Sequence, residues 1–381
     1  MITGDLDAAL APEIERLAPH GAVTSSAGTW RPAPPAQRAP PGRQAPPGQR
    51  APPGQKTLPG QHGETGTYAT TVAFRLASRL GADPAGVADT LADGLRQRDW
   101  VEAASATGAG YLTVTVTAAA LATLAVRITQ AGPACARGTA LAGTTVTAPR
   151  HACLAAAPAW RDAHRRLVAA ITGRLAEAAG ADVHWTEEQD SERMAPADPP
   201  PSAGHAPVAD AIAFAGADAI TFALARLPPA GREPVDVGLA AAHHLGNPAY
   251  AVRYAHAHAA STLRQAADLG LGLADAAGFQ PRLLTHPSEQ ALQYELSWLP
   301  ERVAGAARRG QPDVLARYLE GLAWAYLGCQ QKCPAVWPGM RARAPATTAP
   351  ATTARLWLAA AARTALGAGL CLLGVSAPER L

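Results

Sequence analysis

Aromatic residues are scarce in this sequence, because Phe, Trp and Tyr make up only 5% of its 381 residues. Alanine supplies much of the 48% hydrophobic content, which is enough for sizeable cores. Since alanine is the strongest helix former, we expect mostly helices that pack closely through small side chains. The length of the chain allows two or three domains.

Lysine is almost absent, since Lys56 and Lys332 are its only occurrences and arginine carries the rest of the positive charge. The net charge of +3 is a weak signal for any class of partner. Arginine binds phosphates in a bidentate manner, but high-GC coding also favours arginine. The excess of arginine therefore does not by itself indicate nucleic acid.

The five cysteines have neither zinc-ribbon nor disulfide-framework spacing. Cys329 and Cys333 lie four residues apart in a predicted helix, where buried thiols are expected. No apolar run of about 18 residues is present, and the N-terminus lacks the basic-then-apolar pattern of a signal peptide. These absences predict a cytoplasmic, reduced protein that does not contact a membrane.

The first third of the chain has the pattern of a small α/β domain, which we place at residues 1–130. Residues 5–17 put leucine and isoleucine on one helical face. A second helix is expected at 69–80, and a third begins at Asp83, which caps a helix whose first residue is proline. The stretch "GYLTVTV" alternates as a strand.

A proline-rich insert interrupts this domain at residues 31–63. It contains a repeat of roughly six residues of the type APPGQR, in which proline removes backbone donors and nothing is apolar enough to bury. The pattern predicts an extended, disordered segment. Its periodic basic residues leave contact with nucleic acid open, beside the alternative of a passive linker.

The rest of the chain divides into a second α/β piece at 138–195, a linker at 196–207 and a helical section at 208–381. In the α/β piece, "GTTVTAP" and "ADVHW" are strand-like and flank a helix at 158–179. The helical section has long apolar periodicities with little strand signal, which predicts a bundle interrupted by a loop at 339–354. The fold class is thus α+β and mainly α.

Three stretches resemble arginyl-tRNA synthetases. The run "GTYATTVAFRLASRLGADPAGVADTLADGL" with "ATGAGYLTVTV" is similar to the family's N-terminal domain, which binds the tRNA elbow. The run "GNPAYAVRYAHAHAASTLRQA" resembles the motif that opens its anticodon-binding domain. The runs "LARYLEGLAWAY" and "GLCLLGVSAPERL" resemble its last helices. The resemblance implies a truncated Rossmann-like remnant of the catalytic domain at 138–195 and a DALR-type anticodon-binding bundle at 208–381.

The chemistry of this family needs a His-x-Gly-His loop, whose imidazoles stabilise charge on the transferring phosphoryl group. No two of the eleven histidines lie three residues apart, and the loop would fall at residues 159–162, which read Ala-Trp-Arg-Asp. The family's mobile lysine-rich loop has no counterpart, and 131–207 is too short for a whole ATP-binding domain. We therefore predict a chain with no catalytic residues and no activity, which binds neither ATP nor another cofactor.

The histidine-rich stretch predicts a helix that begins near residue 248. Its aromatic and polar residues share one stripe, formed by Tyr250, Tyr254, His258, Ser261 and Gln265. Its apolar residues form another stripe that faces the bundle, made of Val252, Ala255, Ala259 and Leu263. A helix with one buried side and one aromatic, polar side suits unstacked bases.

Core packing is favoured over RNA contact for both Tyr250 and His256, whereas the resemblance favours RNA contact for Tyr254 and His258. A shared metal is geometrically poor, because His256 and His258 point roughly 200° apart on a helix and His243 and His244 are adjacent. We therefore predict no metal site in this stretch.

The resemblance implies residue roles that the spacing alone does not. Contacts to the anticodon fall on Tyr250, Arg253, Tyr254, His258, Ser261 and Leu381, and contacts to the tRNA elbow on Tyr111 and Thr113. Several of these depart from the family, which has Arg at the His258 position, Gln at Arg253, Met at Leu381 and Asn at Thr113. Selectivity for arginine tRNA is therefore expected to be loosened. Candidate phosphate contacts, each also readable as a solvated arginine, are Arg253, Arg264, Arg317 and Arg355.

Our first hypothesis is a non-catalytic tRNA-binding protein that binds the elbow and the anticodon arm of a tRNA, with arginine tRNA favoured. It would serve a protein partner that uses aminoacyl-tRNA, for example in a biosynthetic pathway. One alternative is a scaffold for a synthetase or biosynthetic enzyme that has lost tRNA contact. Another is a residual ATP-dependent arginine–tRNA ligase.

Overall fold

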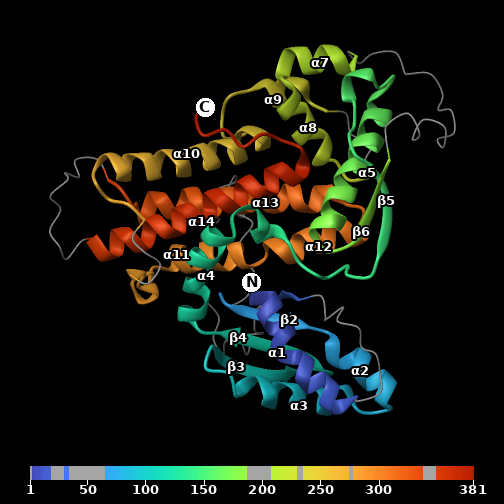
Figure 1. The fold of residues 1–381 in the computed structure, drawn as a ribbon, viewed down its shortest axis with the longest axis vertical. Helices are drawn as coiled ribbons and strands as arrows, with labels where there is room; N and C mark the ends of the chain where they lie inside the picture. The colour runs from blue at the N-terminus through green and yellow to red at the C-terminus, as the bar shows by residue number, and fades with distance from the viewer. Residues whose placement is uncertain are drawn as a thin grey trace, which may run out of the picture.

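The structure is a computed structural model. It describes residues 2–18, 30–33, 65–186, 207–229, 235–273, 278–337 and 349–381. The proline-rich repeat beyond residue 33 and the linker up to residue 206 lie outside these described residues. Residues 31–32, predicted as the start of the disordered insert, form a strand instead. Of the loop predicted at 339–354, residues 339–348 lie outside the described residues, and residues 349–354 are helical rather than a loop. Helices and two small sheets build the described part, which confirms the predicted α+β, mainly α class (Figure 1).

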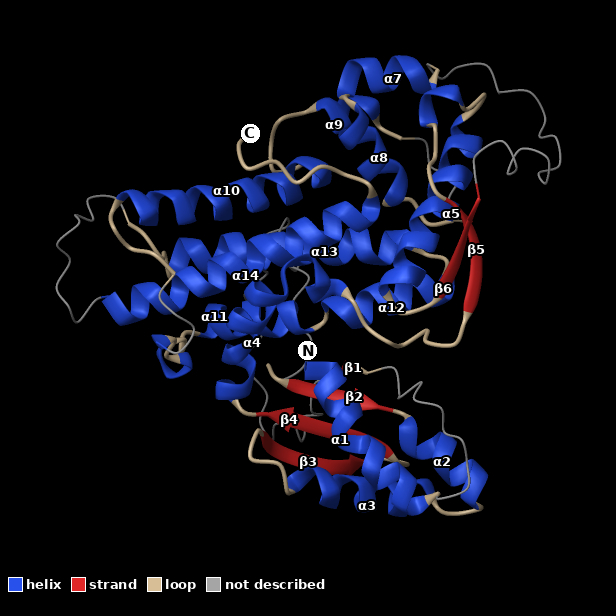
Figure 2. Ribbon diagram, in the orientation of Figure 1, coloured by secondary structure: helices blue, strands red, loops and turns tan. Residues whose placement is uncertain are grey.

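The N-terminal part contains a four-stranded antiparallel sheet in the order β1-β2-β4-β3 (Figure 2). Its strands are β1 (Arg31–Pro32), β2 (Thr67–Thr70), β3 (Val101–Thr107) and β4 (Tyr111–Val116). The alternation predicted for "GYLTVTV" is confirmed, because Leu112, Val114 and Val116 are buried while the residues between them point to the other face.

Three helices complete this part. They are α1 (Ile2–Leu17), α2 (Val72–Leu80) and α3 (Pro84–Arg96). The predicted cap of α3 is confirmed, since the Asp83 carboxylate accepts a hydrogen bond from Gly86 N at 3.0 Å. The helix predicted at 69–80 begins only at Val72, because the residues before it pair with β4 as strand β2.

The chain leaves the sheet through α4 (Ala118–Ala131), followed by the 3-10 turn η1 (Gly132–Ala136). Helix α4 packs against α11 (Pro287–Ser297) and α14 (Ala349–Leu373), which belong to the C-terminal bundle. The residues from 118 onward, which we had assigned to the N-terminal domain, therefore contact both parts of the molecule. The division of the chain into four parts stays a prediction.

The middle of the chain forms a β-α-β unit. Its elements are β5 (Thr145–Pro149), the 3-10 turn η2 (Leu154–Ala156), α5 (Trp160–Ala178) and β6 (Asp182–Thr186). The two strands are parallel, and α5 packs on one face of the pair. The approach is close at Gly173, where any Cβ would overlap Ala148 of β5. The strands and the helix predicted here are thereby confirmed.

The C-terminal part is a bundle of helices around a core of leucine and alanine. Its remaining elements are α7 (Val208–Ala215), α8 (Ala217–Ala225), α9 (Val237–Ala241), α10 (Pro248–Asp268), η4 (Pro281–Leu283), α12 (Leu299–Arg309) and α13 (Pro312–Lys332). Helices α10, α13 and α14 pack against one another. The predicted burial of Cys329 and Cys333 is confirmed.

One described helix, α14, is long and apolar enough by composition to cross a membrane, although no unbroken apolar run was found in the sequence. In the structure, 72% of its most apolar window is buried. Helices α10, α11 and α13 surround it, so its apolar surface serves as the core of the bundle.

Candidate nucleic-acid interface

Helix α10 begins at a buried asparagine. The Asn247 Oδ1 accepts a hydrogen bond from Ala249 N at 3.0 Å, while its Nδ2 donates to the carbonyl oxygens of Ala240 and Ala242 at 2.9 and 2.8 Å. A cap that also binds the preceding turn holds α10 in a fixed direction relative to α9. The predicted start of this helix is confirmed.

One face of α10 is sealed against α13 and α14. Val252, Ala255 and Ala259 are completely buried, as the predicted apolar stripe requires, whereas Leu263, its fourth member, is only half-buried. His256 is also buried, and its Nδ1 lies 2.8 Å from the carbonyl oxygen of Pro378. Core packing of His256 is confirmed, because its ring joins the helix to the C-terminal segment.

An aromatic ladder runs along the adjacent face of α10, formed by His243, Tyr250, Tyr254, His258 and Tyr326. Successive ring centroids lie 5.8, 5.9, 5.9 and 5.8 Å apart. The first two pairs are stacked, with interplanar angles of 15° and 17°. These spacings fall in the range of favourable aromatic contacts, about 4.5–7 Å. The spacing of the tyrosines and His258 therefore produces one continuous row of rings.

The ladder passes from the surface into the core. His243 is exposed, Tyr250, Tyr254 and His258 are half-buried, and Tyr326 is buried. The half-buried rings are partly accessible to solvent and are held by contacts with their neighbours in the row. Rigid, partly exposed rings are suitable platforms for unpaired bases. Contact of these residues with an anticodon stays a prediction.

His258 is tied to the core by a hydrogen bond, since its Nδ1 lies 3.1 Å from the Tyr326 hydroxyl oxygen. Burial lowers the pKa of its imidazole, so the ring is neutral at neutral pH. His258 can therefore stack and form hydrogen bonds, but it does not supply the charge of the arginine that the family has at this position. Ser261 is half-buried one turn further along α10.

Arg253 already has partners within the protein. Its guanidinium lies 3.2 Å from an Asp218 carboxylate oxygen and donates to the Ser376 hydroxyl at 3.4 Å. Ser376 N in turn donates to Asp218 at 3.0 Å. Arg253 therefore has to leave a network that anchors the C-terminal segment before it binds a phosphate.

The C-terminal segment follows α10 and is held by two further arginines (Figure 1). Arg264 donates to the Glu379 carbonyl oxygen at 3.1 Å and lies 3.7 Å from its carboxylate. Arg363 pairs with the same carboxylate at 2.8 Å. The final residue, Leu381, is 58% exposed, so its side chain is accessible as the predicted anticodon contact requires.

The two other candidate phosphate contacts differ in their surroundings. Arg317 is exposed and lies 3.6 Å from the Asp313 carboxylate, one turn earlier on the same helix. Arg355 pairs at 2.7 Å with Glu289, whose side chain is only 1% exposed. Arg355 therefore has a structural task that the sequence did not reveal. Arg317 is more exposed, although its guanidinium also donates to the Arg226 carbonyl oxygen at 3.5 Å.

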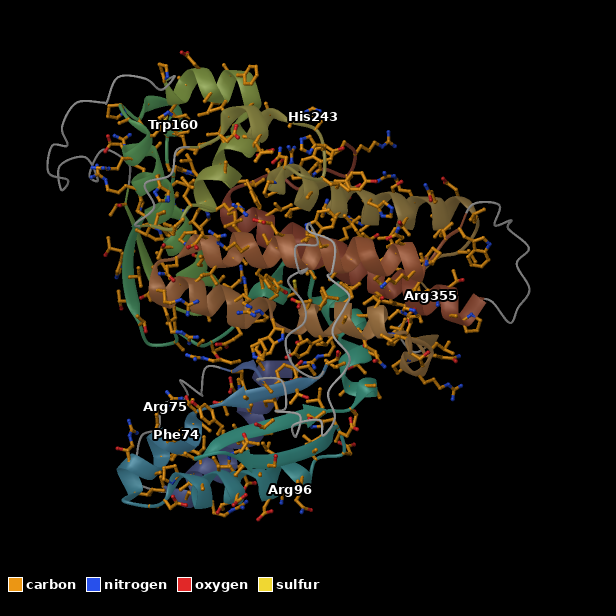
Figure 3. The ribbon with its side chains drawn as sticks, turned by 180° about the vertical axis from the view of Figure 1, so that it is seen from behind. Phe74, Arg75, Arg96, Trp160, His243 and Arg355 are labelled. Carbon is orange, nitrogen blue, oxygen red and sulfur yellow. The ribbon has the colours of Figure 1, made fainter. Side chains whose placement is uncertain are left out.

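The two predicted elbow residues lie on the outward face of β4. Tyr111 is 48% exposed, and its ring contacts that of Phe74 edge-on at 5.2 Å. The Thr113 hydroxyl lies 2.9 Å from the Thr107 hydroxyl of β3. Figure 3 shows Phe74 in the N-terminal part and His243 in the bundle, far apart on the molecule. The two groups of candidate residues are therefore separate contact areas.

Sequence reasoning missed His243, Tyr326 and Phe74. His243 lies in the loop before α10, and helical periodicity does not place a loop residue on the face of a helix. Tyr326 comes from α13, and no local pattern connects it with α10. Among the described residues, no group of three or more His, Cys, Asp or Glu could hold a metal ion.

Two parts of the chain match known domain families. Residues 59–116 match the arginyl tRNA synthetase N terminal domain, and residues 252–381 match the DALR anticodon binding domain. The first match contains Tyr111 and Thr113, and the second contains most of the aromatic ladder. The two matches lie in the N-terminal part and in the C-terminal bundle, respectively.

Curated relatives carry the name arginine–tRNA ligase. The protein of Paenarthrobacter aurescens is 38% identical over 172 residues, which cover 45% of this chain and 30% of the relative. That of Chloroflexus aggregans is 44% identical over 136 residues, covering 36% of this chain and 22% of the relative. The arginyl-tRNA synthetase structure from Thermus thermophilus is 23% identical, with a TM-score of 0.35, and covers 62% of this chain and 40% of that chain.

Over these matched segments the chain is similar to arginyl-tRNA synthetases. The matched region spans less than a third of the length of these curated relatives.

The relatives contradict our prediction that the chain is not an enzyme. Arginine–tRNA ligase is the name of an enzyme family, and nothing in the matches shows that this protein lacks activity. The prediction rested on missing motifs in a segment of the chain that these two domain families do not cover. Whether a cofactor binds stays a prediction.

Proposed function

We propose that this protein binds tRNA, with arginine tRNA preferred, through two contact areas. The exposed edge of the aromatic ladder would hold unpaired bases of the anticodon arm, and the Tyr111–Thr113 strand would contact the elbow. The single observation that carries the proposal is the row of half-buried rings at Tyr250, Tyr254 and His258, fixed from behind by Tyr326.

The physical basis is stacking combined with charge. An unpaired base on an aromatic ring contributes about 1–3 kcal/mol, and a ring that is already immobilised loses little entropy on binding. Arginines near the ladder then neutralise phosphates, which makes affinity fall as salt rises. Arg317 on α13 is exposed and suited to this role, while Arg253 and Arg264 would exchange a carboxylate partner for a phosphate.

A mutation in the middle of the ladder tests the proposal. With the full chain and an arginine tRNA transcript at low salt, Tyr254→Ala is expected to weaken binding about 5- to 150-fold, corresponding to about 1–3 kcal/mol. Tyr254→Phe keeps the ring and is expected to bind within about threefold of wild type. Filter binding over a salt series measures both the affinity and the salt slope.

Phe214→Ala is the matched control, because Phe214 is 71% exposed and lies on α7, outside the ladder. It is expected to leave the affinity unchanged. Absence of salt-sensitive binding below about 10 μM, a level that non-specific electrostatic attraction already reaches, would rule out the tRNA-binding proposal. Equal affinity for arginine tRNA and an unrelated tRNA would remove the arginine preference alone.

A second candidate function is arginine–tRNA ligase activity, which the name of the curated relatives favours. ATP–pyrophosphate exchange with arginine and tRNA measures it directly. Exchange above a no-arginine control supports the ligase, and exchange equal to that control contradicts it.

A protein partner that uses aminoacyl-tRNA is a further part of the proposal. Pull-down with and without ribonuclease separates the modes of association. A partner lost on nuclease treatment is bridged by tRNA, whereas one that is retained binds the helical bundle directly and favours the scaffold alternative.

A further inference from the structure

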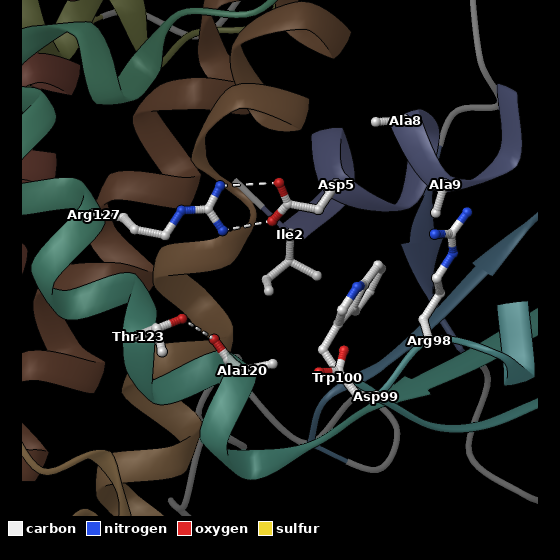
Figure 4. Close-up of a pocket in the computed structure, with 10 residues that line it drawn as sticks. All are labelled: Ile2, Asp5, Ala8, Ala9, Arg98, Asp99, Trp100, Ala120, Thr123 and Arg127. Atoms are coloured by element: carbon white, nitrogen blue, oxygen red, sulfur yellow. Dashed lines mark hydrogen bonds and ion pairs between the residues drawn. The ribbon is translucent and has the colours of Figure 1, made fainter.

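A cleft of about 560 Å³ lies where the N-terminal part meets helix α4. Its walls come from α1, from the turn between α3 and β3, and from the first turns of α4 (Figure 4). Its volume falls in the range of small-molecule pockets, about 300–1,000 Å³. None of the residues that we assigned to tRNA contact lines it.

The turn at Arg98, Asp99 and Trp100 supplies one wall of the cleft. The Trp100 carbonyl oxygen accepts a hydrogen bond from Thr117 N at 3.0 Å, which fixes the turn next to the start of α4. The Trp100 ring is half-buried, and the buried side chains of Ile2 and Ala9 line the same space. The cleft therefore has an aromatic and apolar surface on which a flat ring can lie.

The polar groups of the cleft divide into engaged and available ones. Arg127 and Asp5 form a two-pronged ion pair, with nitrogen–oxygen distances of 2.5 and 3.0 Å. Within the described residues, the side chains of Arg98, Asp99 and Trp100 have no hydrogen-bond or ion-pair partner. Figure 4 shows the Trp100 ring between the Asp5–Arg127 pair on one side and Arg98 on the other. One cation, one anion and one indole N–H are thus available beside a ring.

We propose that this cleft binds a guanine nucleotide. The base would lie on the Trp100 ring, the Asp99 carboxylate would accept the two adjacent N–H groups of the guanine edge, and Arg98 would contact the phosphate. A carboxylate matches two neighbouring donors, which guanine presents and adenine does not. A purely anionic ligand would be repelled by Asp99, and a metal cation by Arg98.

The ligand has two possible sources, an unpaired guanosine of an RNA or a free nucleotide. The recognition chemistry is the same for both, namely an aromatic base with an attached phosphate. A guanosine of a bound RNA would make the cleft a third RNA contact area, between the sheet and the bundle. A free nucleotide would make it an independent site.

Calorimetric titration of GMP into the full chain tests the cleft. We expect saturable one-site binding, at least tenfold weaker binding of AMP, and weaker binding of guanosine, which lacks the phosphate. Arg98→Gln is expected to reduce GMP affinity to the guanosine level and to leave guanosine affinity unchanged. Asp99→Asn is expected to remove the preference for GMP over AMP. Arg79→Gln, an exposed arginine on α2, is the control and should change nothing.

Trp100→Phe keeps a stacking ring and is expected to retain most GMP affinity, whereas Trp100→Ala loses it. If GMP does not saturate the protein by about 10 mM, or if GMP and AMP bind equally, the proposal is wrong. A competition experiment assigns the source: tRNA that displaces GMP indicates a guanosine in RNA, and simultaneous binding indicates a free nucleotide. Because GMP binding needs no tRNA, its failure leaves the tRNA-binding proposal standing, and the reverse also holds.

Discussion

At the scale of single residues, Asp7 is a carboxylate whose ionised form is disfavoured by its burial in the fold. Its Oδ1 accepts a hydrogen bond from the buried Trp30 indole at 2.7 Å. The pKa of Asp7 is raised to about 7, chiefly by burial and in smaller part by nearby Glu301, while Trp30, Arg308 and Arg75 oppose the rise. Asp7 is thus close to its titration midpoint at neutral pH.

This placement predicts a pH-dependent stability. Because the folded state retains a proton that an unfolded Asp releases near pH 4, stability is highest below that pH and falls as pH rises through about 7. Asp7→Asn keeps the acceptor for Trp30 without the charge. Its melting temperature is expected to exceed that of wild type by a few degrees at pH 8, corresponding to about 1 kcal/mol, and to match it at pH 4. Differential scanning calorimetry at both pH values measures the melting temperature. Asp93→Asn, at an exposed position, is the control. An equal shift of the Asp7→Asn variant at both pH values would contradict a raised pKa of Asp7.

At the scale of elements, helices α11 and α14 are joined by a buried charge. Glu289 lies in the first turn of α11, where one carboxylate oxygen accepts from His286 N at 2.9 Å and the other pairs with Arg355 at 2.7 Å. A buried carboxylate is stable only while its partners remain. The ion pair therefore fixes the beginning of α14 against α11.

Arg355→Ala is expected to destabilise the protein by about 3–5 kcal/mol, because it leaves the Glu289 carboxylate buried without its cation. Denaturant unfolding measures the loss, and Arg317→Ala, whose partner Asp313 is on the same helix, is expected to cost less than about 1 kcal/mol. The same variants test the predicted phosphate contacts, since loss of one contact lowers the salt slope of tRNA binding by about 1. If Arg355→Ala lowered the salt slope of tRNA binding but left the free energy of unfolding unchanged, Arg355 would be a phosphate contact and not a structural residue.

At the scale of the whole molecule, a buried hydrogen-bond chain connects the N-terminal sheet with the bundle. The Tyr68 hydroxyl of β2 donates to the Ser297 hydroxyl at 2.7 Å, and the Tyr294 hydroxyl donates to the Thr67 carbonyl oxygen at 2.8 Å. The Tyr68 ring also contacts Trp298, with centroids 5.0 Å apart. The two candidate RNA contact areas are therefore held in a fixed relation.

Ser297→Ala leaves the buried Tyr68 hydroxyl without an acceptor, which costs about 1–3 kcal/mol. We expect a lower midpoint of denaturant unfolding and, in the wild type, a single transition that includes both the sheet and the bundle. Ser78→Ala, at an exposed position of α2, is the control and should leave the midpoint unchanged. Two separate transitions in the wild-type protein would show that the connection does not couple the two parts.

Local patterns predicted the helices and failed at part of the sheet. The apolar spacing of residues 5–17 and the cap at Asp83 correspond to α1 and α3, because both signals act between near neighbours. Strand β3 was missed, since "VEAASAT" has alanine where β-branched residues would indicate a strand. The start of α2 was placed too early because pairing with β4 turns Thr67–Thr70 into a strand.

Local sequence patterns predicted only part of the candidate site. The spacing of Tyr250, Tyr254 and His258 predicted a shared helix face, and the structure stacks these rings. The two ends of the ladder, His243 and Tyr326, come from a loop and from another helix, where periodicity has no bearing.

The sequence alone determined the mainly helical class, the apolar and aromatic faces of α10 and the resemblance of two segments to arginyl-tRNA synthetases. Such properties depend on residues within one or two helical turns of each other, or on the order of residues along a motif. Only the tertiary structure decided which arginines are engaged, how the ladder is completed, and that a cleft forms beside Trp100. Those features arise between residues far apart in the chain, which meet only when the apolar faces of different elements are buried together.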